Sequence, residues 1–152
     1  FLSISIISSL VKNANDTKAF NTNLDLFLVE AGQLEAMTEQ GVNNDSFRNQ
    51  LAEVKSTYAL LNYSWPQKYK YEKQAFDKAI EGWDLILDVW DFRNDSSIIE
   101  FQDTIYFENA KDYLNDTIKD PEYLTMDDWI GILMGEAGSY YEAGVRGVDS
   151  KK

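Results

Sequence analysis

The residues most able to carry chemistry in this sequence are asparagines in Asn-x-Ser/Thr triplets, the acceptor pattern for N-linked glycans. Five such triplets occur, beginning at Asn15, Asn44, Asn62, Asn94 and Asn115. A random order of the 11 Asn and the 18 Ser and Thr residues would give about one. Asn44 and Asn94 also fall where a helix would need a cap, which explains these two without a glycan. The excess predicts an extracellular or cell-surface protein, periplasmic if the source is bacterial.

A row of carboxylates at helical spacing is a second candidate, because it could hold a hard cation or receive a basic partner. Its members are Asp84, Asp88, Asp91 and Asp95. The spacing is not that of a calcium-binding EF-hand, because a loop read from Asp91 places Arg93 at a ligand position and Gln102 at the last one. A solvated helix face is the plainer interpretation, so the row is a weak metal candidate.

The composition argues against an enzyme. The chain has no Cys and no His, so thiolate chemistry, the commonest general base and the commonest transition-metal ligand are absent. Carboxylates are plentiful, but no nucleophile–base pair or phosphate-binding glycine loop accompanies them. A net charge of −12 repels phosphate backbones, which makes nucleic acid a poor partner. We expect a non-enzymatic protein without a cofactor.

Helices must position these residues. Apolar residues recur in alternating steps of four and three, which predicts an all-α, antiparallel up-and-down bundle of four to five helices in a single domain over residues 1–152. The first helix is long, running from near residue 3 to Gln40 before Gly41 ends it. The expected buried stripes are Phe20, Leu24, Phe27, Ala31, Leu34 and Thr38, then Phe47, Leu51, Val54, Tyr58 and Leu61, then Tyr69, Phe76, Ile80, Trp83, Leu87 and Trp90, then Ile98, Phe101, Ile105, Tyr106, Tyr113 and Leu114, and finally Met126, Ile130, Leu133, Ala137 and Tyr140.

Cap and turn residues mark the expected helix ends. Asn44 or Asp45 would cap the second helix, since short polar side chains accept hydrogen bonds from the first turn. The stretch 94–96 would stop the third helix and cap the fourth. Thr125 would cap the last helix, which would fade over residues 144–147.

Two features predict contact with another chain. Residues 1–11 are apolar and uncharged but too short to cross a bilayer, which takes about 20 residues. They are expected to be an assembly or membrane-proximal element, with a membrane tether before residue 1 as one arrangement. In the last helix, three glycines share one face, which favours the close approach of another helix or another subunit. The interface candidates are Phe1, Leu2, Ile4, Ile6, Ile7, Leu10, Gly131, Gly135 and Gly138.

The leading interpretation is an extracytoplasmic helical bundle that senses a ligand or contacts a protein at the cell surface. In length, helical content and apolar start, it is similar to the four-helix ligand-binding domains of membrane chemoreceptors and sensor kinases, a likeness of architecture. One alternative is a structural subunit of a surface filament, pilus or coat, assembled through residues 1–11 and the glycine face. Another is an acidic inhibitor or immunity-type protein that binds a basic partner. The expected partners are a protein, a second copy of the chain, a small ligand or a hard cation, but not nucleic acid.

Overall fold

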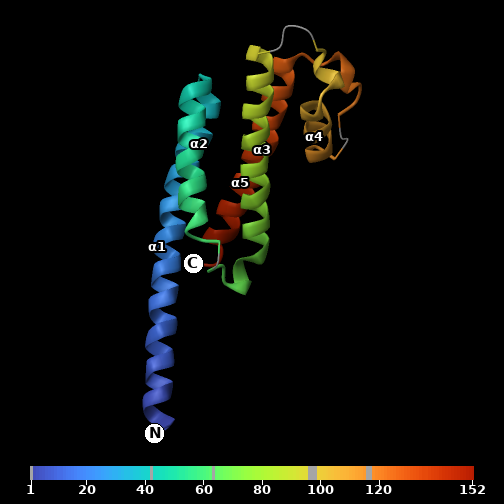
Figure 1. Ribbon diagram of the computed structural model, residues 1–152. Helices are drawn as coiled ribbons and strands as arrows, with labels where there is room; N and C mark the ends of the chain where they lie inside the picture. Colours follow the sequence, from blue (N-terminus) through green and yellow to red (C-terminus); the bar gives the residue numbers. More distant parts are fainter. Residues whose placement is uncertain (1, 42, 63, 96–98, 116–117) are drawn as a thin grey trace.

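The computed structural model describes residues 2–41, 43–62, 64–95, 99–115 and 118–152, with the backbone alone described for residues 2–8. Five α-helices make up most of this part of the chain, and it contains no strand. They are α1 (Leu2–Gln40), α2 (Asn44–Ala59), α3 (Lys70–Asp95), α4 (Ile105–Tyr113) and α5 (Met126–Asp149), with three 3-10 turns, η1 (Gln67–Tyr69), η2 (Phe101–Asp103) and η3 (Pro121–Tyr123). The all-α helical bundle expected from the sequence is confirmed (Figure 1).

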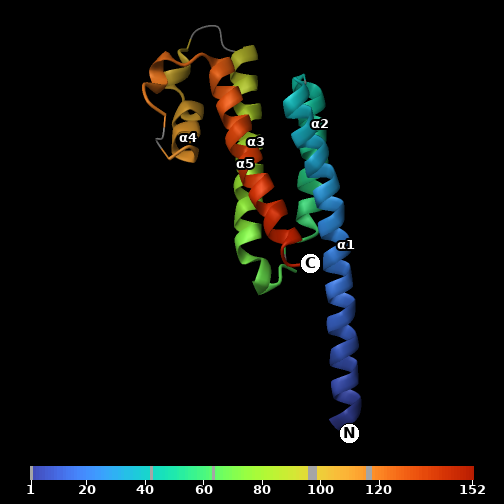
Figure 2. The ribbon, with the colours of Figure 1, turned by 180° about the vertical axis from the view of Figure 1, so that it is seen from behind.

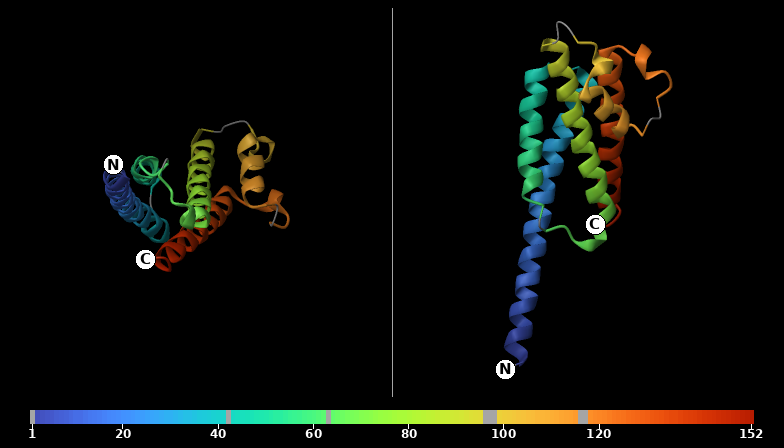
Figure 3. Two further views of the ribbon diagram at one scale, coloured as in Figure 1. Left: turned by 90° about the horizontal axis from the view of Figure 1, so that it is seen from below. Right: turned by 45° about the vertical axis from the view of Figure 1, so that its right-hand side comes forward.

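The helices are arranged as two pairs with α4 at one side. α3 and α5 share the most extensive interface, and α1 and α2 form the second pair. Seen from below, α4 lies on the far side of α3 from the α1–α2 pair (Figure 3). Arg48, near the start of α2, forms an ion pair with Asp91, near the end of α3. Tyr58, near the end of α2, donates a hydrogen bond to Asp77, which is nearer the start of α3. These contacts show that α2 and α3 run in opposite directions.

The core consists mainly of the stripes expected from the sequence. Ten members of the α1 and α2 stripes are buried, namely Phe20, Leu24, Phe27, Ala31, Leu34, Phe47, Leu51, Val54, Tyr58 and Leu61. On α3 the buried surface is wider than one stripe, because α2, α4 and α5 all pack against this helix. Ala79, Ile86 and Val89 are therefore also fully buried.

The cap of α2 and the end of α5 differ from the expected ones. Asn43, not Asn44 or Asp45, caps α2, because its side chain accepts a hydrogen bond from the Ser46 amide at 2.8 Å. In α5 the expected cap is confirmed: Thr125 and the acidic residue three positions later form a reciprocal capping box. α5 does not fade over residues 144–147 but continues to Asp149.

The fourth helix starts later than expected. Asn94 stays inside α3, while Thr104 caps α4 by accepting a hydrogen bond from the Phe107 amide. The bend before α4 places Phe101 in a 3-10 turn, where its ring packs against Phe107 and residues of α3 and α5. The shift turns Ile105 outward, with 65% of its surface exposed, so its expected burial was wrong. Tyr106 is likewise partly exposed, and Ile98 and Ser96 lie outside the described residues.

The glycine face predicted on the last helix does not form a continuous contact. Gly131 and Gly135 are exposed, and a Cβ atom built at either would meet no atom within 4 Å. Only Gly138 is buried, against the carboxylate of Glu35 on α1. The three positions share a helix face, but α3 approaches α5 along a different face.

Two other glycines allow α3 and α5 to pack closely. A Cβ atom at Gly82 of α3 would collide with the Tyr113 hydroxyl and lie 2.8 Å from the Cβ of Ala137. A Cβ atom at Gly144 of α5 would collide with the Phe76 ring. Since real Cβ atoms do not approach so closely, glycine is required at both positions for this packing.

The first part of α1 extends beyond the rest of the bundle. In Figures 1 and 2 the N-terminal part of the helix continues well below the other four, and its C-terminal part lies beside α2 and α5. Every residue from Ser9 to Ala19 is exposed, including Leu10 and Val11 at 62% and 55%. Burial begins at Phe20. Within the described ranges, no helix is long and apolar enough to cross a membrane.

Candidate functional site

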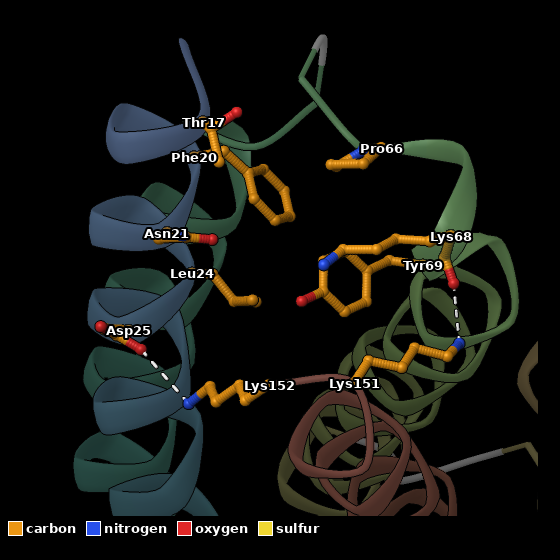
Figure 4. A pocket seen from close by; sticks show the side chains of 10 residues that line it. All are labelled: Thr17, Phe20, Asn21, Leu24, Asp25, Pro66, Lys68, Tyr69, Lys151 and Lys152. Atoms are coloured by element: carbon orange, nitrogen blue, oxygen red, sulfur yellow. Dashed lines mark hydrogen bonds and ion pairs between the residues drawn. The ribbon is translucent and has the colours of Figure 1, made fainter. Parts of the chain in front are cut away.

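A cavity of about 390 Å³ opens at the level where α1 leaves the bundle. We call it the basal pocket. It lies between α1 on one side and η1 with the end of α5 on the other (Figure 4). Its wall consists of Thr17, Phe20, Asn21, Leu24, Asp25, Pro66, Lys68, Tyr69, Lys151 and Lys152.

The apolar wall of the basal pocket follows from two local features of the sequence. The α1 stripe places Phe20 and Leu24 toward the bundle, each 2% exposed. Pro66 lacks an amide hydrogen and begins a 3-10 turn, in which the Tyr69 amide donates to the Pro66 carbonyl at 2.9 Å. This turn brings the Tyr69 ring to a stacked position 5.7 Å from the ring of Phe20. Two aromatic rings and a leucine thus line the inner side.

Three lysines give the pocket a positive rim in an otherwise acidic protein. The Lys68 ammonium lies 4.7 Å from the centre of the Tyr69 ring and extends across it toward α1 (Figure 4). Lys152 is 3.7 Å from a carboxylate oxygen of Asp25, a long ion pair between exposed groups. Lys151 turns away from the cavity, where its ammonium donates to the Lys68 carbonyl at 2.7 Å.

The position of Lys151 depends on a buried carboxylate behind the pocket. Glu72, in the first turn of α3, is 6% exposed and is the one charged residue that is buried among those described. Its Oε1 atom accepts a hydrogen bond from Lys151, next to Gly147, where a Cβ would collide with the carboxylate. This ion pair ties the start of α3 to the end of α5.

Two members of the acidic row predicted as a weak metal site, Asp84 and Asp91, form ion pairs with α2. The members of the row are Asp84, Asp88, Asp91 and Asp95. Lys55 of α2 donates to both oxygens of Asp84 at 2.9 Å, and Arg48 donates to Asp91 at 2.5 Å. The hydrogen bond from Arg48 lowers the pKa of Asp91, while burial and the charges of its two neighbours in the row raise the pKa of Asp88. Over the described ranges, no group of three or more Asp and Glu residues could hold a metal ion.

Most of the glycan acceptor candidates are at the surface. Asn15, Asn62, Asn94 and Asn115 are exposed, and Asn115 has a left-handed backbone with φ of 51°. Asn44 is half-buried, and its amide donates to Asp91 at 3.3 Å, which restricts access to that nitrogen. Four residues of the triplets, Tyr63, Ser96, Asp116 and Thr117, lie outside the described residues.

The N-terminal interface candidates are only partly described. Phe1 lies outside the described residues, and for Leu2, Ile4, Ile6 and Ile7 the structure describes a helical backbone alone. The side chain of Leu10 is 62% exposed on the projecting part of α1. Leu10, Gly131 and Gly135 are thus the interface candidates that the structure describes as accessible to another molecule.

A half-buried carboxylate lies where α1 meets α5. Glu35 of α1 packs on Gly138 of α5, and its Oε2 atom is buried without a hydrogen-bond partner in the described part of the chain. Burial, followed by the negative charges of Glu39 and Glu142, raises the pKa of Glu35 from 4.5 to about 6. Because the folded pKa exceeds the unfolded one, protonation of Glu35 stabilises the fold, and this stabilisation is lost as the pH rises through about 6.

We therefore expect Glu35→Gln to be more stable than the wild type at pH 8, by ~1 kcal/mol after allowing for solvent screening of a half-exposed group. The two proteins should converge as the pH falls below about 4.5, where the wild-type carboxyl is protonated in the folded and the unfolded state alike. Urea unfolding at several pH values measures this. Glu53→Gln, the same change at an exposed glutamate of α2, should run parallel to the wild type. If the free energy of unfolding of Glu35→Gln also runs parallel to that of the wild type across this pH range, the prediction is wrong.

Comparison with known proteins gives no relative from which a role could be transferred. No protein family, characterised protein or solved structure matches the chain. Function must therefore be inferred from the geometry of this molecule.

The sequence alone did not single out the basal pocket as a site. Lys68 and Lys151 are 83 positions apart, and neither belongs to a recognised motif. One signal was available: lysines are concentrated near residue 70 and at positions 151–152 of a chain with a net charge of −12. The two segments meet because α3 and α5 run in opposite directions, with Arg93 paired to Asp127 at one end and Glu72 paired to Lys151 at the other.

Proposed function

We propose that this chain is a non-enzymatic, extracytoplasmic helical-bundle domain that binds a small ligand in the basal pocket. The observation that carries the proposal is the position of the cavity. A ligand held there would contact α1, η1 and the end of α5 together, and so would touch the projecting helix and the body of the bundle at the same time. A volume of about 390 Å³ lies within the range of small-molecule sites, about 300–1,000 Å³.

An outer-surface location is supported by the exposed Asn-x-Ser/Thr acceptors and by the direction of α1. The projecting part of the helix leads to the uncharged apolar residues 1–11. Such a segment fits a membrane-proximal position, with the bundle held away from the surface. A mass decrease of the natively produced protein after glycosidase treatment would support this location and exclude an intracellular inhibitor of a basic partner.

Self-assembly as a surface filament or coat is the second candidate. It is favoured by the exposure of Leu10 and Val11, because exposed apolar side chains on a projecting helix are typical of a surface that another chain covers. Removal of residues 1–11 should abolish assembly if this candidate is right. The same truncation should leave ligand binding unchanged if the basal pocket is the functional site.

Blocking the basal pocket tests the ligand-binding proposal even while the ligand is unidentified. Asn21 is exposed on the α1 wall of the cavity, and Asn21→Trp would fill much of the space. The protein and the variant are dialysed against a metabolite extract, and the retained small molecules are compared by mass spectrometry. We expect at least one compound to be enriched by the wild type and not by Asn21→Trp.

The matched control is Thr22→Trp, which adds the same ring at an exposed position of the same turn outside the pocket wall. It should retain the compound as the wild type does. Circular dichroism melting of both variants establishes that the bundle is folded. If no compound separates the wild type and Thr22→Trp from Asn21→Trp, the proposed function is wrong.

A further inference from the structure

We propose that the basal pocket selects a small, soluble organic anion, with one carboxylate or phosphate group at the lysine side and an apolar body against Phe20 and Leu24. This inference rests on the proposed binding function and adds the chemical class of the ligand. It depends on the charge of the wall, on the orientation of Lys68, and on the apolar residues of the wall.

The charge of the wall is opposite to that of the protein. The chain carries 26 acidic and 14 basic residues, yet the wall of the basal pocket holds three lysines and one carboxylate, that of Asp25, and it stays positive although Glu72 behind the wall pairs with Lys151. Most charged surfaces of this molecule therefore repel an anion, while this cavity attracts one. A local reversal of sign inside a concave wall concentrates the potential at the site.

Lys68 is oriented to bind the anionic group. Among the residues that the structure describes, no carboxylate forms an ion pair with Lys68. Its ammonium is held over the Tyr69 ring at 4.7 Å from the centroid and points into the cavity (Figure 4). Cation–π contact fixes the position of the charge without neutralising it. An anion arriving at Lys68 would displace solvent and would not compete with a protein carboxylate.

Lys152 can provide a second cation, whereas Lys151 cannot. The distances from Lys152 to Asp25 and Asp149 are 3.7 and 3.9 Å, beyond direct hydrogen bonding. Lys151 is instead bound to the buried Glu72 and faces away from the cavity. No arginine lines the wall, so the anion would bind to lysine ammonium groups, which act as point charges, and not to a planar guanidinium group with two parallel donors. Carboxylate and phosphate both suit such a site.

The remaining wall defines the rest of the ligand. Phe20 and Leu24 of α1 face Pro66 and the Tyr69 ring across the cavity, and the uncharged polar groups of the wall are the Asn21 amide and the hydroxyls of Thr17 and Tyr69. The Thr17 hydroxyl already donates to the Asn13 carbonyl at 2.9 Å. An apolar body gains free energy on leaving water and on contact with the aromatic rings of the wall. A fully polar ligand such as a neutral sugar would make few favourable contacts with the apolar residues of the wall.

Phenylacetate is a suitable probe because it joins one carboxylate to one ring, and phenylacetamide is its neutral counterpart. Each is titrated into the ¹⁵N-labelled full chain at constant ionic strength, with inorganic phosphate as a third titrant. We expect phenylacetate to shift the amide signals of η1 and of the α1 turn around Leu24 in a saturable way. Phenylacetamide should bind at least about tenfold more weakly, because it lacks the charge that Lys68 meets. Phosphate should shift the same η1 signals at higher concentration.

Lys68→Gln should weaken phenylacetate binding about tenfold, while Lys119→Gln, the same charge change at an exposed lysine outside the pocket, should not. The anion assignment is overturned if phenylacetate gives no saturable shift, if phenylacetamide binds equally well, or if both lysine variants lose affinity alike. Should dialysis then still yield a neutral compound that Asn21→Trp fails to bind, the binding function stands and only the ligand class is wrong. Should dialysis also yield no such compound, both proposals fail.

Discussion

Phe76→Ala is expected to lower the free energy of unfolding by about 3–5 kcal/mol, the usual cost of removing a buried aromatic ring. The Phe76 ring is fully buried in α3. Its neighbours are the rings of Phe27 at 5.0 Å, Trp65 at 6.1 Å and Tyr141 at 6.2 Å, which come from α1, the α2–α3 connection and α5. The ring thus joins both helix pairs, and no single neighbour can move in to fill the space.

Urea unfolding followed by tryptophan fluorescence and by circular dichroism measures this loss. Tyr71→Ala, which removes a 73% exposed ring from the same helix, is the matched control and should cost less than about 0.5 kcal/mol. A loss below about 1.5 kcal/mol for Phe76→Ala would show that the ring does not hold the two pairs together.

Gly144 provides an independent check on the same contact. In the wild type, Gly144→Ala should destabilise the protein because its methyl group would collide with the Phe76 ring. In the Phe76→Ala background the methyl group enters the space that the ring has left. The two substitutions should therefore be less than additive, by about 1 kcal/mol or more in a double-mutant cycle. Additive effects would mean that the α3–α5 contact is not the one described.

The second large effect is expected at the end of α5. Lys151→Met should cost about 3 kcal/mol, because Glu72 would remain buried without its cation. Replacing both partners, in Glu72→Leu with Lys151→Met, should recover most of the loss, since an apolar pair carries no desolvation penalty.

Lys152→Met is the control for the loss of a terminal positive charge. The ion pairs of Lys152 are long and exposed, so this variant should change stability by less than about 0.5 kcal/mol in the same urea experiment. If the double variant is no more stable than Lys151→Met alone, the ion pair is not what fixes the end of α5.

Local patterns predicted the helices well where one face of a helix is buried. The stripes of α1 and α2 follow a three–four spacing because each helix packs on one side, and all their large apolar members are buried. α3 is less regular since three helices surround it, and Ala79, Ile86 and Val89 are buried outside the expected stripe. Near α4 the apolar pattern predicted the wrong start of the helix, because Phe101 is held in a bend by aromatic rings from distant segments.

The candidate site could not be predicted from local patterns. Each pocket lysine lies in a polar segment that is typical of an ordinary protein surface, and the sequence pattern predicts Tyr69 as a core residue. Their combination depends on which helix ends meet, a property of the tertiary fold. The glycines show the same limit: of Gly131, Gly135 and Gly138, which regular spacing singled out, only Gly138 makes a close contact. Gly82 and Gly144, which the spacing did not single out, lie against Tyr113 and Phe76.

The continuity of α1 has a mechanical consequence. At 1.5 Å per residue, this 39-residue helix is a rod of about 58 Å, and more than a third of it lies beyond the basal pocket. A rod supported near its middle acts as a lever. A tilt of roughly 5° at the support would move the free end by about 2 Å, on the scale of one residue's rise. Any adjustment of α1 to the contents of the pocket would therefore be transmitted, enlarged, to whatever holds its N-terminal end.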